Sequence, residues 1–243
     1  MIETLLLTAA SVASFNAQIL RTRASGFFFM RDQRLFLVTS RHVLIDEASR
    51  HFPDRIEIEL HVDADNLAVS TGFSLPLYRD GGRLWREAQD GGSIGDVAVL
   101  EIDRAAWPAN ALFRAFTPNH LVTSYDQIEV GSSLLVLGFP LGFQDTLHHL
   151  PVVRQAAIAS SFGLRFQGQG YFLTDARTHR GTSGAPVVMR ALGDMAGQGD
   201  LPWWLLGIHS ARLDVGRDQQ MDEALGLNCA WYADILMQLT APA

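Results

Sequence analysis

The amino-acid sequence predicts an all-β protein built from two β-barrels that follow each other along the chain. Short apolar or alternating runs recur between clusters of Gly, Pro, Asp and Asn, which is the pattern of a barrel or sandwich. The stretch 107–127 contains two prolines and few alternating positions, and it divides these runs into two comparable sets. Two consecutive barrels fit this division better than one large closed barrel. We therefore expect one barrel over residues 1–116 and a second over residues 117–243.

The expected strands cover most of both halves, and helix is a minor component. Only two segments have helical patterning: 4–15, weakly, and 230–239, where apolar side chains recur four residues apart. The expected strands are Ala17–Arg23, Gly26–Arg31, Leu35–Thr39, Arg55–Val62, Val97–Ile102, Ser133–Leu137, Val152–Ser160, Gly170–Thr174, Ala185–Met189 and Trp203–His209.

Composition and charge exclude several classes of function. With 48% hydrophobic and only 19% charged residues, the 243-residue chain is typical of a folded globular protein rather than a disordered one. The formal net charge is −7 and the basic residues are scattered, which argues against a nucleic-acid partner. No apolar run is long enough to span a bilayer, so we expect no membrane association.

The chain contains a single cysteine, Cys229, within an apolar stretch. One thiol can form neither an intrachain disulfide nor a cysteine-based metal site, and we expect a buried structural role for it. The apolar start of the chain lacks the basic residues of a secretory signal. Together these features favour a cytoplasmic location.

A serine flanked by glycines marks the candidate nucleophile. Ser183 lies between Gly181-Thr182 and Gly184, directly before an apolar strand. Glycines allow a sharp turn that brings backbone N–H groups together beside the serine oxygen, as an oxyanion hole requires. A serine also needs a base, and the base needs a carboxylate that fixes its tautomer.

Two residues at strand ends can supply these groups. Of the eight histidines, His42 follows the apolar run 35–39, and Asp96 stands at the start of the apolar run 97–100. Each alone would be an ordinary structural residue, but the order His, Asp, Ser indicates a catalytic triad.

These segments resemble the trypsin-like serine proteases, in particular their disulfide-free bacterial branch. The family implies two orthogonal six-stranded antiparallel β-barrels, an active site in the cleft between them, and a C-terminal helix packed on the second barrel. The resemblance extends over most of the chain, in the segments Gly26–Phe29, Leu37–Val43, Gly95–Leu100, Gly138–Gly142, Thr174–Ala176, Gly181–Pro186 and Gly207–Ser210.

The resemblance also implies the role of each site residue. Ser183 would be the nucleophile, His42 the general base and Asp96 its orienting carboxylate. The N–H groups of Gly181 and Ser183 would form the oxyanion hole. The Ser210 hydroxyl would support the aspartate, while the backbone of Ser210, Ala211 and Arg212 would pair with the substrate as an added strand. Neither a metal nor an organic cofactor is required.

Two residues depart from the family pattern. Arg41 stands where a small residue usually precedes the base, so the packing behind His42 should differ. Thr182 replaces the Asp or Asn usually found before the nucleophile. Because that Asp captures a new N-terminal amine in secreted members, we expect this chain not to use their zymogen switch.

The specificity pocket implied by the resemblance contains Thr178 and His209, a pair similar to that of glutamyl endopeptidases. Both side chains can donate hydrogen bonds to a carboxylate or amide oxygen. Arg177 and Arg212 flank the same pocket, and no carboxylate is placed to accept Lys or Arg, apart from Asp175. We therefore expect Glu, Asp or Gln on the acyl side of the scissile bond. In the alternative, His209 is a packed strand residue and the pocket is small and apolar.

The predicted function is a serine endopeptidase that acts on a protein or peptide substrate through an acyl-enzyme on Ser183. One alternative is a catalytically silent protease fold that binds peptides or a protein partner. A second is an esterase of the α/β-hydrolase type, but that fold has the order Ser, Asp, His and many helices. The sequence determines neither the physiological substrate nor the oligomeric state.

Overall fold

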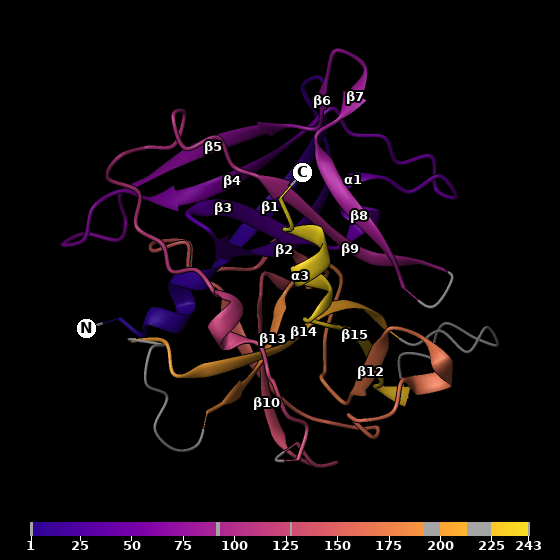
Figure 1. Ribbon diagram of the computed structural model, residues 1–243. Helices are drawn as coiled ribbons and strands as arrows, with labels where there is room; N and C mark the ends of the chain where they lie inside the picture. Colours follow the sequence, from indigo (N-terminus) through magenta and orange to yellow (C-terminus); the bar gives the residue numbers. More distant parts are fainter. Residues whose placement is uncertain (1, 91–92, 127, 192–199, 213–224, 243) are drawn as a thin grey trace.

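The structure is a computed structural model that describes residues 2–90, 93–126, 128–191, 200–212 and 225–242. Two large antiparallel sheets dominate it: the first half of the chain forms the upper sheet in Figure 1 and the second half the lower one. The described helices are short, comprising α1 (Arg41–Leu44), α3 (Ile235–Leu239) and the 3₁₀ turns η1 (Thr4–Thr8), η2 (Pro118–His120), η3 (Pro140–Gly142) and η4 (Phe166–Gly168). The all-β prediction is confirmed.

The first sheet has seven strands in the order β5-β4-β1-β2-β3-β9-β8. It has one more than the six expected because a small hairpin divides the strand between β4 and β9 in two. The first part of this divided strand, β5, pairs with β4, and the second part, β8, pairs with β9. Leu84 N donates to Leu77 O across the interruption (3.0 Å). The strands are β1 (Ala9–Asn16), β2 (Ile19–Arg31), β3 (Arg34–Thr39), β4 (Arg55–His61), β5 (Ser70–Pro76), β8 (Trp85–Asp90) and β9 (Ser93–Glu101), with the hairpin β6 (Tyr78–Arg79) and β7 (Gly82–Arg83).

The second sheet has six strands in the order β11-β10-β13-β14-β15-β12. Its two edges meet, because Ala159 N beyond β11 donates to Leu173 O of β12 (2.8 Å) and Ile158 forms a bridge with Thr174. The sheet therefore closes on itself. Its strands are β10 (Ser133–Gly138), β11 (Val152–Ala157), β12 (Tyr171–Thr174), β13 (Pro186–Arg190), β14 (Trp203–Arg212) and β15 (Asn228–Tyr232).

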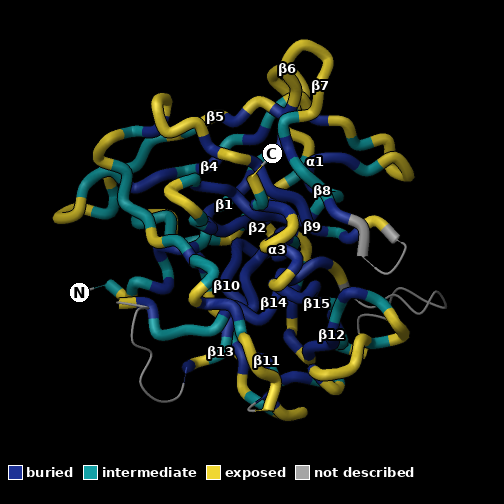
Figure 2. The backbone as a smooth tube through the Cα atoms, in the orientation of Figure 1, coloured by how far each residue is buried: buried dark blue, intermediate teal, exposed yellow. Residues whose placement is uncertain are grey.

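Each sheet encloses its own apolar cluster, and a third cluster joins the two sheets. The run of phenylalanines in β2 shows how one strand serves two clusters: Phe28 faces the first-sheet core, while Phe27 and Phe29 face Val188 and Ile208 of the second half. Successive side chains alternate between faces, so a continuous apolar run is needed where both faces are dry. Figure 2 shows this buried centre.

Both predictions of longer helices are corrected by the structure. The segment 4–15 forms η1 and then β1, because β1 pairs with both β2 and β4 and buries alternate side chains. Residues 230–232 belong to β15, and α3 begins only at Ile235. Cross-strand pairing on both sides outweighs the four-residue spacing there.

The C-terminal helix also packs differently from the arrangement that the resemblance implies. Arg86 of β8 donates to Ala241 O (2.5 Å), and Arg31 of β2 donates to Met237 O (2.7 Å). Helix α3 thus ties the end of the chain to the first sheet. No helix among the described residues is both apolar and long enough to cross a bilayer.

Candidate active site

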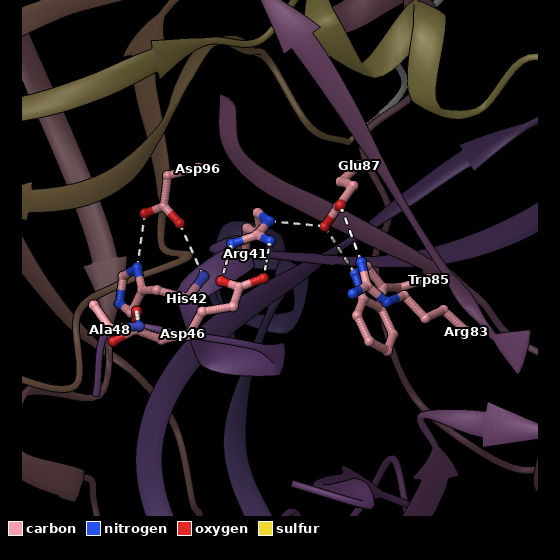
Figure 3. A network of polar contacts seen from close by, with 9 residues as sticks. Arg41, His42, Asp46, Ala48, Arg83, Trp85, Glu87 and Asp96 are labelled. Atoms are coloured by element: carbon pink, nitrogen blue, oxygen red, sulfur yellow. Dashed lines mark hydrogen bonds and ion pairs between the residues drawn. The ribbon is translucent and has the colours of Figure 1, made fainter. Parts of the chain in front are cut away.

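Strand pairing brings the candidate base and its carboxylate together. Thr39 of β3 lies opposite Ala98 of the antiparallel β9, so His42 beyond β3 and Asp96 at the start of β9 meet at the same end of the sheet. His42 N donates to Asp96 Oδ1 (2.9 Å), and His42 Nδ1 lies 2.7 Å from Asp96 Oδ2. Figure 3 shows the carboxylate facing both nitrogens. With Nδ1 engaged, Nε2 is the ring nitrogen available to accept a proton.

Ser210 adds a third hydrogen bond to the same carboxylate. Its buried hydroxyl donates to Asp96 Oδ2 at 2.5 Å, from β14 of the second sheet. Three donors, contributed by both halves of the chain, hold the carboxylate in one orientation. The predicted support of Asp96 by Ser210 is therefore present as a contact.

The pKa of His42 is raised above its ordinary value of 6.5. Burial of the ring lowers this pKa, but the hydrogen bond that His42 donates to Asp96, the charge of Asp96 and the charge of Asp46 outweigh burial. The site favours the imidazolium form of His42, which is the form a general base reaches after taking a proton.

The loop of Ser183 is fixed by backbone hydrogen bonds to both sheets. Ser183 O accepts from Ser25 N of β2 (2.9 Å), and Gly184 N donates to His209 O of β14 (2.7 Å). His209 O also accepts from Ser40 Oγ, just before the base (3.3 Å). Gly184 has φ +86°, and a Cβ there would overlap Ser25 O. Only glycine fits this turn.

The peptide before Gly181 is oriented for an oxyanion hole. Arg180 O accepts from Leu141 N (2.5 Å). Because the N–H and C=O of a trans peptide point in opposite directions, the Gly181 N–H is turned away from Leu141. Gly181 has φ +94°, and a Cβ would lie 2.6 Å from Phe139 O. Neither Gly181 N nor Ser183 N is bonded to another described residue, so both can donate to a developing oxyanion.

A cleft of about 470 Å³ connects these groups, and its walls come from both sheets. His42 and Ala24 line it from the first sheet, and Gly181 and Ser183 line it from the loop of the second. The structure therefore brings His42, Asp96 and Ser183 together at this cleft.

The residues predicted to form the acyl-side pocket lie on neighbouring segments and do not line this cleft. His209 pairs with Ala230 on β15, and Arg212 pairs with Asn228. Thr178 Oγ1 donates to Asn228 Oδ1 (2.6 Å), and Asn228 Nδ2 donates to Ala176 O (2.5 Å). The Thr178 hydroxyl thus donates its single proton to Asn228, whereas the sequence analysis expected it to donate to a substrate.

His209 is buried with only 2% of its surface exposed, and its Nδ1 has no hydrogen-bond partner among the described residues. Burial, reinforced by the charge of His42, lowers the pKa of His209 to about 4, although the charge of Asp96 acts in the opposite direction. With no substrate bound, the imidazole ring of His209 is therefore neutral near pH 7.

The predicted substrate-pairing strand has free backbone positions. The register between β14 and β15 is interrupted between His209 and Arg212, and β13 pairs with β14 no further than Ile208. On the β13 side, Ser210 and Ala211 therefore have no strand partner among the described residues, and Ala211 is exposed. The side chain of Arg212 lies outside the described part of the chain.

The two departures have local explanations. Arg41 forms an ion pair with Glu87 of β8 (2.8 Å), as Figure 3 shows, and a second one with Glu47 (2.9 Å). The pKa of Arg41 is raised, chiefly by the hydrogen bond to Glu47, with burial opposing. Thr182 is buried and packs its methyl group beside Gly138.

Two structural residues of the site were missed by sequence reasoning. Ser25 is buried on β2; its hydroxyl donates to Gly181 O (2.7 Å) and accepts from Phe139 N (3.0 Å). Asn228 is buried beneath Thr178. Ser25 has no sequence signal, since a serine before a glycine is common. Asn228, a polar residue beside the apolar run 229–236, gave a weak one.

The fold and the geometry of the site are those of the trypsin-like peptidase class. The sequence profile of the trypsin-like peptidase domain matches residues 24–197, which include His42, Asp96 and Ser183. The chain therefore belongs to the trypsin-like peptidase domain family.

A solved structure supports the same fold. The crystal structure of the serine endoprotease from Yersinia pestis superposes with a TM-score of 0.52 at 18% sequence identity. The match covers 96% of this chain and 61% of that chain, so this chain spans about three-fifths of the Yersinia protein. No curated protein sequence matches significantly.

Proposed function

We propose that the protein is a serine endopeptidase that cleaves peptide bonds through an acyl-enzyme on Ser183. The observation that carries this proposal is the set of three hydrogen bonds to Asp96, which prepares His42 as a base beside Ser183. The unpaired N–H groups of Gly181 and Ser183 complement that base.

In the proposed reaction, His42 Nε2 takes the Ser183 hydroxyl proton while Oγ bonds to the scissile carbonyl carbon. The oxyanion accepts hydrogen bonds from Gly181 N and Ser183 N. The C–N bond then breaks, and His42 gives its proton to the departing amine. In the second half-reaction, water bonds to the acyl carbon while His42 takes its proton. The ester bond to Ser183 then breaks, His42 returns the proton to Ser183 Oγ, and the acid is released.

Labelling with a fluorophosphonate probe tests the catalytic assignment. The folded protein should react stoichiometrically at Ser183, and Ser183→Ala should not react. Folded protein that is inert toward the probe and toward a broad peptide library would support the silent scaffold instead.

We further propose that the acyl-side pocket prefers Glu, with Asp or Gln next. The support is His209: a buried, neutral imidazole with an unpartnered Nδ1 gains a hydrogen bond when a carboxylate or amide oxygen arrives. An arriving carboxylate would also favour the charged imidazole. Thr178 can join only if its hydroxyl is released from Asn228.

Profiling of cleavage sites on a peptide library tests this preference. Glu should dominate immediately before the scissile bond. A dominant Lys or Arg, or a dominant Val or Ala, would contradict it and favour a pocket in which His209 only packs.

A further inference from the structure

The cleft continues past Ser183 on the side opposite β14. There its wall is the segment 20–24 near the start of β2, in which Leu20, Arg21 and Arg23 are exposed, together with Arg180 of the nucleophile loop. If the acyl part of a peptide pairs with Ser210 and Ala211, the leaving-group part must pass along this wall. The inference below therefore rests on the proposed endopeptidase function.

Arginine is concentrated on this wall. Arg21, Arg23 and Arg180 line the cleft, and Asp46 is the one carboxylate among its lining residues. Three positive charges against one negative charge give a local formal charge of +2, whereas the whole chain has −7. The wall thus has the opposite sign to the protein that carries it.

These three guanidinium groups have no hydrogen bond or ion pair with another described residue. Most other arginines of the described chain are paired, as Arg41 is with Glu47 and Glu87, and Arg114 with Asp200. Asp46 already accepts hydrogen bonds from Ser49 Oγ and Ala48 N. The arginines of the wall are therefore free to bind an external carboxylate.

One of them is held in place by the loop that supports the oxyanion hole. A Cβ on Gly142 would lie 2.6 Å from Arg23 Cδ, so the Arg23 stem lies directly against this glycine. Gly142 belongs to η3. Leu141 of η3 and Phe139, which precedes η3, lie against Gly181. Arg180 precedes Gly181 in sequence. The side chains of Arg23 and Arg180 therefore both begin beside the segments that form the predicted oxyanion hole.

We propose that the protein selects peptides carrying acidic residues on the leaving-group side of the scissile bond, with Arg21, Arg23 and Arg180 as the specificity-determining residues. A guanidinium group presents a fork of donors that fits a carboxylate. Since the arginines are exposed, the selection is electrostatic and screened by salt.

Matched peptides test the proposal. Two internally quenched peptides share one acyl side and carry either Asp-Glu or Asn-Gln after the scissile bond. At low ionic strength, the kcat/KM of the acidic peptide should exceed that of the amide peptide about 10-fold. At about 0.5 M salt the ratio should fall to about 2-fold. A ratio of one or less at low salt would overturn the proposal.

Charge-neutral variants assign the effect to these residues. In Arg23→Gln/Arg180→Gln the acidic-to-amide ratio should fall to about 2-fold, and each ratio is taken within one variant so that changes in overall rate cancel. Arg154→Gln, on the exposed face of β11 outside the cleft, removes one positive charge at a different place and should keep the 10-fold ratio. Equal ratios in the double variant and the wild type would refute the assignment.

A binding assay separates this inference from the proposed chemistry. With Ser183→Ala, fluorescence anisotropy of both peptides measures affinity without cleavage. If the Ser183→Ala protein with its three arginines intact binds the acidic peptide more tightly than the amide peptide, the proposal is supported even if no hydrolysis is ever found. Equal binding of the two peptides at low salt would overturn it even in an active protease.

Discussion

The two sides of Ser183 differ in how their polar groups are arranged. On the acyl side, Thr178, His209 and Asn228 are buried and neutral, and two of them are hydrogen-bonded to each other. On the leaving-group side, Arg21 and Arg23 of β2 and Arg180 are exposed and without described partners. A buried, unpartnered group penalises a wrong substrate strongly and is insensitive to salt, whereas exposed charges discriminate weakly and are screened. The predictions below test this division.

The largest effect is expected where both sides depend on the same chemistry. Ser183→Ala and His42→Ala should each lower kcat by about 10⁴- to 10⁶-fold, and the double variant should lose little more, because the residues act as a unit. The loss should be equal for peptides that differ on either side of the scissile bond. Losses that multiply independently in steady-state kinetics would contradict the triad.

Next comes the carboxylate that orients the base. Asp96→Asn should lower kcat about 10⁴-fold by changing the tautomer that His42 holds. In the wild type, kcat/KM should rise with pH as His42 loses its proton. Because the pKa of His42 is raised, the midpoint should lie above 6.5. A pH profile with its midpoint below 6.5 would show that burial outweighs Asp96 and Asp46.

A smaller effect is expected from His209, and it separates the two sides. His209→Ala should lower the preference for Glu over Ala before the scissile bond about 10- to 100-fold. This preference should change little with salt, unlike the leaving-side ratio, because His209 is buried. The measurement is kcat/KM for paired peptides at low and high salt. Unchanged selectivity in the variant would leave His209 as a packing residue.

The structure brings the three predicted triad residues to one cleft, whereas it corrects one of the predicted helices to a strand; the catalytic roles stay predictions. His42, Asp96 and Ser183 each follow or precede an apolar strand within a dense local motif, and β3–β9 pairing converts that position into contact. The strand β1 was taken for helix, because its pairing on two sides is not encoded in local spacing.

The side-chain contacts that complete the site could not be predicted in the same way. Ser25 reaches Gly181 across 156 residues, and Asn228 reaches Thr178 across 50. Such contacts depend on packing between distant segments. The boundary at 116/117 and the cytoplasmic location stay predictions.

Ser25 should affect both sides moderately, because it supports the oxyanion hole that they share. Ser25→Ala removes the donor to Gly181 O and leaves Phe139 N–H without an acceptor. We expect a loss of about 1–3 kcal/mol in the free energy of unfolding and a lower kcat with little change in KM. Denaturant unfolding and steady-state kinetics measure the two. Ser11→Ala, on the neighbouring strand β1 directly opposite Ser25, is the control and should change kcat little.

The smallest effect is expected at Cys229, a half-buried residue that follows Asn228 in β15. Burial raises the pKa of Cys229 to about 11, with a hydrogen bond from Tyr171 acting in the opposite direction. At pH 8 only about one thiol in 10³ is ionised, so alkylation of the folded protein should be slow. Cys229→Ser should keep kcat/KM within about 2-fold, since no catalytic contact involves the thiol. Time-resolved labelling followed by mass spectrometry checks the rate, with denatured protein as the fully reactive control. Rapid modification of the folded protein, or loss of activity on modification without unfolding, would contradict this prediction.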